Sequence, residues 1–367
     1  MVRLAFATER ISWKAWNILP YLAERFEITL ITYSKPEEIP EAKYREVVHV
    51  CPRRHEMLPS TAWEMSRHID RLYKEGRIDF AYVYSSIAYF IRLCPYVNVV
   101  NGSFFEDFQI WMSYAPYKRK LRALVGFIHY VIPEVIACKR AAKIITVSQS
   151  LGNLIRHRYG RDVRDVYPVL NGLGIDYLDL YDEDKFDSPT ISILYSGRLH
   201  LRKGILNLVK EFTRRPHISV SFNILGDGPD RNELQRIAQP DKRIVIRGHL
   251  DRASMAKLIQ ETVIYVFPSL HEGFGLSLVE AMASGHACLV YDMPVNREIL
   301  GEAGIYAPYN RPAAMLDILE DSLPKREGLR LKAREAHEKA KQYSWERCAH
   351  DMEDALNRIH KEITAGY

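Results

Sequence analysis

No Cys-x-x-Cys motif occurs in the chain, and its cysteines are too scattered to suggest a disulfide framework. There are five of them: Cys51, Cys94, Cys138, Cys288 and Cys348. An odd number of isolated cysteines is typical of reduced, mostly buried thiols in an intracellular protein. We therefore expect a cytoplasmic location.

The chain also lacks a strong charge of either sign. Its 51 Lys and Arg residues are nearly balanced by 46 Asp and Glu residues, which leaves a net charge of +5. This mild charge is compatible with phosphorylated ligands or anionic lipid, but it is too weak to indicate nucleic acid as a partner. With 47% hydrophobic and 26% charged residues, the 367-residue chain has the composition of a soluble globular protein of about two domains.

A glycine-rich turn is missing where a dinucleotide-binding enzyme needs one. The first apolar run, Val2 to Ala7, predicts a strand, and Thr8-Glu9-Arg10 follows it without a glycine. Dehydrogenases that use a dinucleotide are therefore disfavoured, because their pyrophosphate lies against glycines in this turn.

Short apolar runs alternate with helix-like segments in both halves of the chain. In the first half, the expected strands are Val2 to Ala7, Ile28 to Tyr33, Val47 to Val50, Phe80 to Tyr84, Val97 to Val100 and Ile144 to Val147. In the second half, they are Ile191 to Tyr195, Val220 to Leu225, Ile244 to Ile246, Val263 to Phe267 and Cys288 to Tyr291. This alternation predicts an α/β fold with two doubly wound, Rossmann-like domains facing a cleft.

Turn residues and a charged run separate the two halves. Asn171-Gly172-Leu173-Gly174 is followed by an acidic segment from Asp179 to Asp187, which is typical of an interdomain connection. We expect an N-terminal domain over 1–170, a linker over 171–189, a C-terminal domain over 190–343 and a final helix over 344–367 that packs back towards the N-terminal domain. Asp182-Glu183-Asp184 has the D-x-D spacing of some metal sites, but within a charged linker we interpret it as solvated.

The stretch from Pro268 to Gly285 joins a strand end, a glycine turn and a helix start. Gly273 and Gly275 let a ligand approach the main chain, and the free N–H groups at the helix start favour a phosphate. Glu272 and Glu280 frame this turn. Taken alone, they could be an ordinary loop residue and an ordinary helix residue; as ligand contacts, they would reach different parts of one extended ligand.

Three further turns follow strands of the same expected sheet. They are Ser196-Gly197-Arg198, Gly226-Asp227-Gly228-Pro229 and Gly248-His249-Leu250. Because the carboxyl ends of parallel strands share one edge of a sheet, we expect all four turns to form one site with close backbone access.

These motifs resemble those of the retaining, nucleotide-sugar-dependent glycosyltransferases of GT-B fold with the E-x7-E signature, which form glycosyltransferase family 4 (glycosyl transferases group 1). The similarity covers most of the segment from Asn171 to Tyr306. The matching residues are Asn171-Gly172 with Ile175-Asp176, Ser196 to Leu199, Lys203-Gly204, Gly226 to Pro229, Arg247-Gly248, Glu272 to Gly275, Glu280 to Gly285, and Asn296 to Ile299.

The resemblance implies a role for each group. Arg198 and Lys203 would neutralise the donor diphosphate, Glu272 would bind sugar hydroxyls, and Glu280 would bind ribose hydroxyls. The other donor-binding residues would be Gly197, Gly226, Gly228, Arg247, Gly248, Gly273, Phe274, Gly275 and Leu276. The donor would be a UDP-, GDP- or ADP-sugar, and the reaction would need neither a cofactor nor a metal, because Arg and Lys supply the positive charge.

The N-terminal half departs from the family pattern. Many relatives have a glycine-rich loop after the first strand and a histidine after the strand equivalent to Val97 to Val100, where this chain has Asn101-Gly102-Ser103. The acceptor-side candidates are Glu9, Arg10, Asn101 and Ser103, for a glycan, a glycolipid or another hydroxyl compound. Either a different donor sugar is used or catalysis is weakened. The alternatives are a catalytically silent GT-B protein that binds a nucleotide, and a related sugar-nucleotide epimerase or phosphorylase.

Basic residues flank an apolar middle between Tyr117 and Lys143. The middle contains Arg122, His129, Pro133 and Glu134, which argue against a membrane span. Two interpretations remain: an amphipathic helix that touches anionic lipid at the inner face of a membrane, or a domain-covering helix with a solvated basic face.

Overall fold

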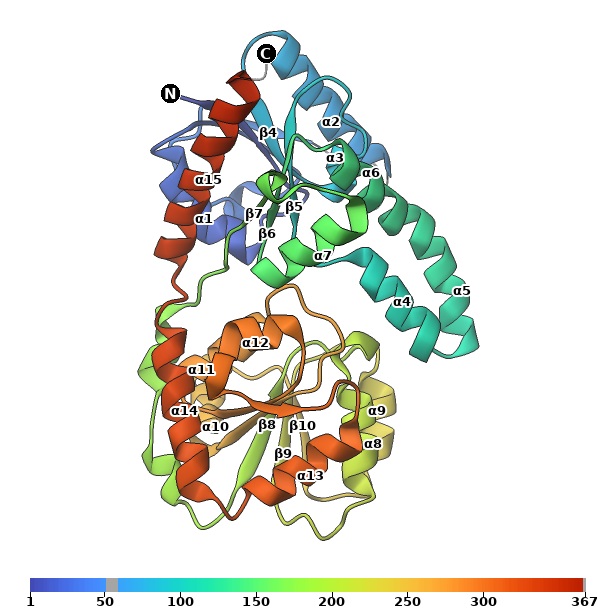
Figure 1. The fold of residues 1–367 in the computed structure, drawn as a ribbon, viewed down its shortest axis with the longest axis vertical. Coiled ribbons are helices and arrows are strands. Elements are labelled where there is room, and N and C mark those ends of the chain that lie inside the picture. The colour runs from blue at the N-terminus through green and yellow to red at the C-terminus, as the bar shows by residue number, and fades with distance from the viewer. Residues whose placement is uncertain (51–58, 366–367) are drawn as a thin grey trace. The chain divides into compact units, whose positions relative to one another are not determined.

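The computed structural model describes residues 1–50 and 59–365, and the chain divides into two compact units. The first unit contains Met1–Phe108, Leu121–Gly172 and Trp345–Tyr367, and the second contains Gln109–Lys120 and Leu173–Ser344. Each unit is built on one sheet in which every described strand pair is parallel. The predicted fold class, two doubly wound α/β domains, is confirmed (Figure 1).

The first sheet has the strand order β3-β2-β1-β4-β5-β6-β7. Its strands are β1 Arg3–Ala7, β2 Glu27–Thr32, β3 Glu46–His49, β4 Phe80–Tyr84, β5 Tyr96–Val100, β6 Lys143–Thr146 and β7 Val166–Pro168. The chain winds first to one side of β1 and then to the other, so the order reverses between β1 and β4, where Phe6 lies opposite Tyr82. In a doubly wound sheet, ligands bind at the carboxyl edge of such a switch point.

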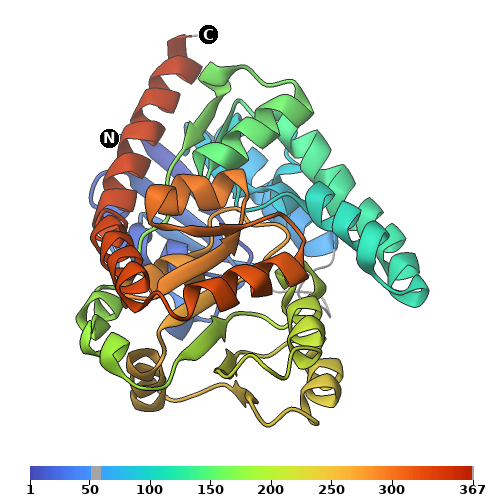
Figure 2. The same ribbon diagram turned by 60° about the horizontal axis from the view of Figure 1, so that its bottom comes forward.

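The helices of the first unit cover both faces of its sheet. They are α1 Trp13–Ala23, α2 Pro59–Lys74, α3 Ser85–Ala88, α4 Phe104–Tyr114, α5 Tyr117–Gly126, α6 Ile132–Arg140, α7 Gln149–Tyr159 and α15 Trp345–Ala365, and a π-helical turn over Phe127–Val131 joins α5 to α6. Parts of α4 and α5 belong to the second unit. Figures 1 and 2 show α15, near the end of the chain, beside α1, and Ile18, Met352 and Ile359 are buried in one core cluster.

The second sheet repeats the arrangement with the order β10-β9-β8-β11-β12-β13, so its switch point lies between β8 and β11. The strands are β8 Ser192–Ser196, β9 Ser221–Leu225, β10 Ile244–Gly248, β11 Ile264–Phe267, β12 Ala287–Tyr291 and β13 Ile305–Ala307. The helices are α8 Ile205–Thr213, α9 Arg231–Ala238, α10 Arg252–Glu261, α11 Leu276–Ala283, α12 Pro294–Leu300, α13 Pro312–Ser322 and α14 Arg326–Ala340.

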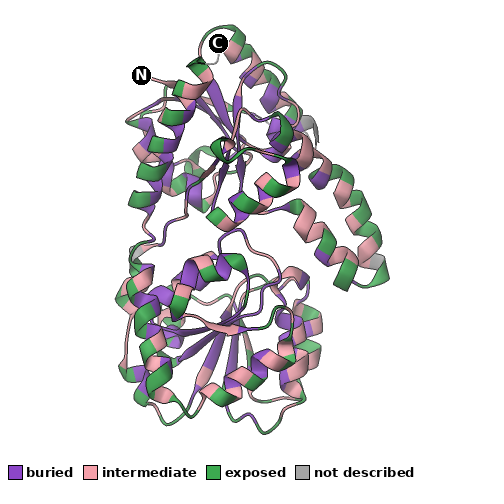
Figure 3. Cartoon of the chain, in the orientation of Figure 1, coloured by how far each residue is buried: buried purple, intermediate pink, exposed green. Residues whose placement is uncertain are grey.

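Burial explains why the central strands could be predicted from the sequence. All residues of β11 and β12 are buried, as expected for parallel strands covered by helices on both faces (Figure 3). The edge strand β10 alternates buried and exposed residues. The strand β13 was not predicted, because its three residues are too few to show a pattern; its pairing with β12 holds it in the sheet.

Candidate functional site

The glycine turns that follow the strands of the second sheet lie side by side at its carboxyl edge. The Gly197 N–H donates to Leu225 O at 3.1 Å, and the Gly226 N–H donates to Gly248 O at 2.9 Å. These bonds join the turns after β8, β9 and β10. The turn after β11 is joined to the same group, because the Leu270 N–H donates to the carbonyl of Arg202 at 2.8 Å.

Two of these glycines are required by the closeness of the turns. A Cβ atom on Gly226 would lie 2.0 Å from the carbonyl oxygen of Gly197, and one on Gly228 would lie 2.2 Å from the carbonyl oxygen of Leu199. Gly226 also has a φ of +124°, which side chains disfavour. Any larger residue would therefore push the turns apart.

Lys203 and Glu272 meet at the switch point of the second sheet. Lys203 ends a short 3₁₀ turn after β8, Glu272 follows β11, and the lysine ammonium forms an ion pair with the carboxylate. Burial alone would raise the pKa of Glu272, but the charge and hydrogen bond of Lys203 outweigh it and hold that pKa below its usual value. Lys203 therefore keeps the Glu272 carboxylate charged.

Arg198 provides a second cation at this edge. Its side chain is exposed and, within residues 1–50 and 59–365, has no hydrogen bond or ion pair. The hydroxyl of Tyr195 donates to the Arg198 carbonyl at 3.1 Å, and the hydroxyl of Tyr265 donates to Ser196 O at 2.8 Å. These bonds hold the turn, so the backbone of Arg198 is positioned while its guanidinium is free to meet an anion.

The turn Gly273-Phe274-Gly275 leads into α11. Gly275, with a φ of +95°, caps the helix, which begins at Leu276 and presents its N-terminus at the edge. Phe274 is buried, with its ring centroid 5.7 Å from that of Tyr343. A helix N-terminus with a left-handed glycine before it suits a phosphate group, as the sequence predicted.

Glu280 lies within α11, whereas Glu272 precedes this helix, and the two side chains have different environments. The neighbours of Glu280 include Tyr177, Ser277 and Tyr265, and burial raises the pKa of this carboxyl group to about 7. Glu272 precedes the helix, so the two carboxyl groups are not part of one helical face. The two carboxyl groups therefore differ: Glu272 forms an ion pair with Lys203, whereas burial sets the pKa of Glu280.

Arg247 is held against the sheet. Its Nε and Nη2 atoms donate to the side-chain oxygen of Asn223 at 3.1 and 3.0 Å. Gly248 follows it with a φ of +67° at the end of β10. The structure thus brings Gly248 to the shared edge, while the described contacts of the Arg247 guanidinium are with the neighbouring strand.

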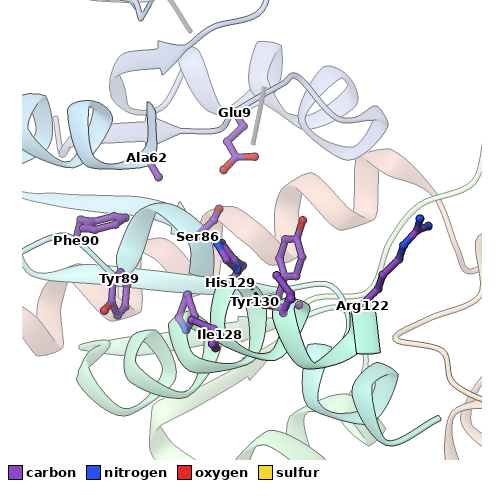
Figure 4. A pocket seen from close by; sticks show the side chains of 12 residues that line it. Glu9, Ala62, Ser86, Tyr89, Phe90, Arg122, Ile128, His129 and Tyr130 are labelled. Atoms are coloured by element: carbon purple, nitrogen blue, oxygen red, sulfur yellow. Dashed lines mark hydrogen bonds between the residues drawn. The ribbon is translucent and has the colours of Figure 1, made fainter. Parts of the chain in front are cut away.

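The acceptor-side candidates of the first unit are dispersed. Glu9, after β1, lines a cavity of about 610 Å³ at the switch point of the first sheet (Figure 4). Arg10 is its exposed neighbour, and Asn101 is exposed after β5. Ser103 is 1% exposed, and its hydroxyl donates to the buried carboxylate of Glu134 at 2.9 Å.

Sequence reasoning missed part of the wall of this cavity. The position of Ser86 after a strand marks it in the sequence as a possible ligand contact, but Arg122, His129 and Tyr130 come from the helical stretch that contains α5 and the π-helical turn. Which face of that stretch turns inwards depends on tertiary packing, so its sequence gives no signal for these residues.

Comparison with known families finds two matches. Residues 190–323 match the family model described as "Glycosyl transferases group 1", and residues 15–177 match "Glycosyltransferase Family 4". A curated relative is glycogen synthase of Mycobacterium tuberculosis, which is 29% identical over 154 residues, 40% of this chain and 36% of that protein. The chain thus spans about a third of that relative's length.

Solved structures share the fold over the whole chain. Sucrose-phosphate synthase from Thermosynechococcus elongatus superposes with a TM-score of 0.76 at 15% identity and full coverage of both chains. HepE of Anabaena, in complex with UDP and glucose, has a TM-score of 0.67 at 15% identity, with 98% of this chain and 100% of that chain covered. Residues 15–177 therefore carry a Glycosyltransferase Family 4 domain and residues 190–323 a Glycosyl transferases group 1 domain, and the chain has the GT-B fold.

Proposed function

We propose that the chain is a retaining, metal-independent glycosyltransferase that moves a sugar from a nucleoside-diphosphate sugar to an acceptor hydroxyl. The observation that carries this proposal is the edge of the second sheet, where the exposed Arg198, the Lys203–Glu272 pair and the start of α11 converge. Two cations and a helix N-terminus suit a diphosphate, and a carboxylate beside them suits sugar hydroxyls.

The charges support the chemistry of the proposed step. The bond between the anomeric carbon and the diphosphate oxygen breaks, and a new bond forms to the acceptor oxygen on the same face of the sugar. The acceptor proton goes to the departing phosphate oxygen. Arg198 and Lys203 stabilise the negative charge that grows on the diphosphate, so their effect is largest in the transition state.

Glu272 and Glu280 are assigned to different parts of the donor. The Glu272 carboxylate, kept charged by Lys203, accepts hydrogen bonds from sugar hydroxyls. Glu280, whose pKa of about 7 leaves it partly protonated, can both donate to and accept from ribose hydroxyls.

The free, buried Cys94, Cys138, Cys288 and Cys348 support a reducing compartment, so the proposal includes a cytoplasmic location. Cys51 lies outside the described residues. Subcellular fractionation tests this part.

The first test is thermal stabilisation by UDP, GDP and ADP, followed by turnover of the matching nucleotide sugars with and without EDTA. The proposal predicts stabilisation by at least one nucleotide, release of that nucleotide from its sugar, and unchanged turnover in EDTA. The anomeric configuration of the transferred sugar, read by NMR, should equal that of the donor. Binding without turnover of any donor would support a silent GT-B protein instead.

A further inference from the structure

The cavity at the switch point of the first sheet has walls of two kinds. Glu9 and Ser86, which follow β1 and β4, supply polar groups on one side, and Arg122 and His129 supply polar groups from the helical stretch that contains α5. Aromatic and aliphatic side chains supply the rest of the wall (Figure 4). A volume of about 610 Å³ lies within the range of small-molecule sites. The cavity therefore suits a ligand that has a polar end and an apolar part.

The polar end of the cavity is suited to hydroxyl groups. Burial raises the pKa of Glu9, and a hydrogen bond from Ser86 opposes that rise. Figure 4 shows the Glu9 carboxyl group and the Ser86 side chain directed towards each other. A carboxyl and a hydroxyl group together can accept from and donate to a hydroxylated ligand.

An exposed apolar stripe runs along α5 and into the π-helical turn. Leu121, Leu124, Val125 and Ile128 are between 47% and 61% exposed. Their spacing of three and four residues, at about 100° per residue, puts them on one side of the helix. Four large apolar side chains in one stripe are more than a solvated helix face normally carries, so this side is suited to a partner.

The charges beside this stripe point to an anionic surface. Residues 117–133 contain no Asp or Glu. At about 100° per residue, Lys120 and Arg122 lie on the two flanks of the stripe. Among the residues that the structure describes, Arg122 has no ion pair or hydrogen bond. Arg119 does not add to this charge, because it pairs with Asp230, and both residues belong to the second unit. Apolar residues flanked by cations are typical of a helix that lies in the plane of an anionic bilayer.

The same stretch does not suit a membrane span, although Arg119–Arg140 is long and apolar enough by composition. Its second part, α6, is anchored in the protein. The Glu134 carboxylate on α6 is buried and accepts hydrogen bonds from the Ser103 hydroxyl, the Phe104 N–H and the Tyr159 hydroxyl. These bonds keep α6 in the fold, so only the α5 side is available to lipid.

Val125 and Ile128 belong both to the exposed stripe and to the cavity wall, so the two surfaces are contiguous. We propose that α5 docks on an anionic bilayer and that the cavity takes the hydroxylated head of a membrane-resident lipid, whose apolar chain follows Val125 and Ile128 to the bilayer. This rests on the proposed function, in which that lipid is the acceptor. The acceptor class is thus an amphiphile with a hydroxyl-bearing head.

Sedimentation with vesicles of 30% phosphatidylglycerol and 70% phosphatidylcholine tests the docking. The wild-type chain should bind them, and Ile128→Asp should weaken binding about tenfold or more, because it places a charge in the stripe that the bilayer would cover. Val163→Asp is the matched control, since Val163 is 58% exposed and Ile128 is 61% exposed. Arg122→Glu should also weaken binding, whereas Lys74→Glu, with the same charge change on α2, should not.

Photolabelling tests the cavity. Phosphatidylglycerol, whose head carries hydroxyls, is given a diazirine near the head and used in the same vesicles. Label should appear on the peptide containing residues 122–133, and Ser86→Leu, which fills the cavity, should reduce it about tenfold while vesicle binding persists. Gly126→Leu is a second filling variant, and thermal melting confirms that each variant folds.

Three results would overturn this proposal: no vesicle binding by the wild type at low salt, equal weakening by Ile128→Asp and Val163→Asp, or undiminished labelling in both filled variants. None of these readouts depends on turnover. Loss of vesicle binding with intact donor hydrolysis would reject the lipid site and leave the proposed function standing. Vesicle binding without any donor turnover would reject the proposed function and leave the lipid site standing.

Discussion

The ammonium group of Lys203 and the carboxylate of Glu272 form an ion pair at the edge of the second sheet, although 69 residues separate them. The pair is largely buried, with side-chain exposures of 15% and 9%. A bound diphosphate would give Lys203 a second anionic partner without leaving Glu272 uncompensated. In the proposed function, Lys203 is thus already in place for the diphosphate before the donor binds.

Lys203→Ala should weaken nucleoside-diphosphate binding roughly 10-fold to 150-fold, which corresponds to the loss of one charge-assisted contact of about 1.5 to 3 kcal/mol. Isothermal titration with the preferred nucleotide measures this effect. Lys210→Ala is the control, because Lys210 pairs with Glu233 on the neighbouring helix and not with a group of the site. Equal affinities for wild type and Lys203→Ala would contradict the assignment.

The same pair predicts a change in acid stability. Lys203 holds the pKa of Glu272 low, so the pair's contribution to stability is present above the unfolded-state pKa of Glu272 and is lost as pH falls through the folded-state pKa. In Lys203→Ala, this acid-side loss should be much smaller, because burial raises the pKa of Glu272 and only the smaller effects of Arg202 and Ser269 still lower it. Urea unfolding between pH 3 and pH 7, at about one-unit steps, compares the two proteins. Parallel pH profiles would count against the pairing.

Glu280 should show the opposite pH dependence. Its folded-state pKa of about 7 lies above the unfolded value, so the folded protein should lose roughly 3 kcal/mol of stability as pH rises from the unfolded pKa to the folded one. Glu280→Gln should remove this decline and be more stable than the wild type at pH 8, while binding nucleotide more weakly. Thermal unfolding across this range is the measurement. A wild-type profile without this decline would show that Glu280 is ionised in the folded protein without cost.

Gly226→Ala should disrupt the edge of the second sheet. Its Cβ would lie 2.0 Å from Gly197 O, so the turns must separate, and the cost should exceed the ~1 kcal/mol of positive-φ strain alone. Gly160→Ala is the control, because Gly160 has a φ of +65° with nothing within 4 Å of an added Cβ. Urea unfolding and nucleotide titration should both separate the two variants. A similar small loss in each would show that the turns can relax.

We expect substitution of Ser103 to lower the stability of the folded protein. Its hydroxyl donates to the buried Glu134 carboxylate, which also binds the Phe104 N–H and the Tyr159 hydroxyl. Ser103→Ala should therefore lower the free energy of unfolding by about 1 to 3 kcal/mol. At a temperature where the variant is folded, its KM for the acceptor should match that of the wild type. A large rise in this KM with unchanged stability would restore Ser103 to the acceptor side.

The parallel sheets and the meeting of the glycine turns could be predicted, because both follow from apolar runs and from the shared carboxyl edge of parallel strands. The strand β4 has the predicted bounds. The Lys203–Glu272 pair could not be predicted, since it depends on the contact between Arg202 O and Leu270 N–H. The residues of α5 that line the cavity could not be predicted either, because only tertiary packing decides which side of a helix faces Glu9.

The central claim is that the edge of the second sheet holds the donor diphosphate. Nucleotide binding to Arg198→Ala tests this claim most directly. Arg236→Ala is the matched control, because Arg236 is an exposed arginine of the same unit, on α9. Titration of UDP, GDP and ADP into the wild type and both variants should give one preferred nucleotide. We predict that its affinity falls roughly 10-fold or more in Arg198→Ala and stays unchanged in Arg236→Ala. Equal affinity in all three proteins, or no binding of any of these nucleotides to the wild type, would contradict the claim.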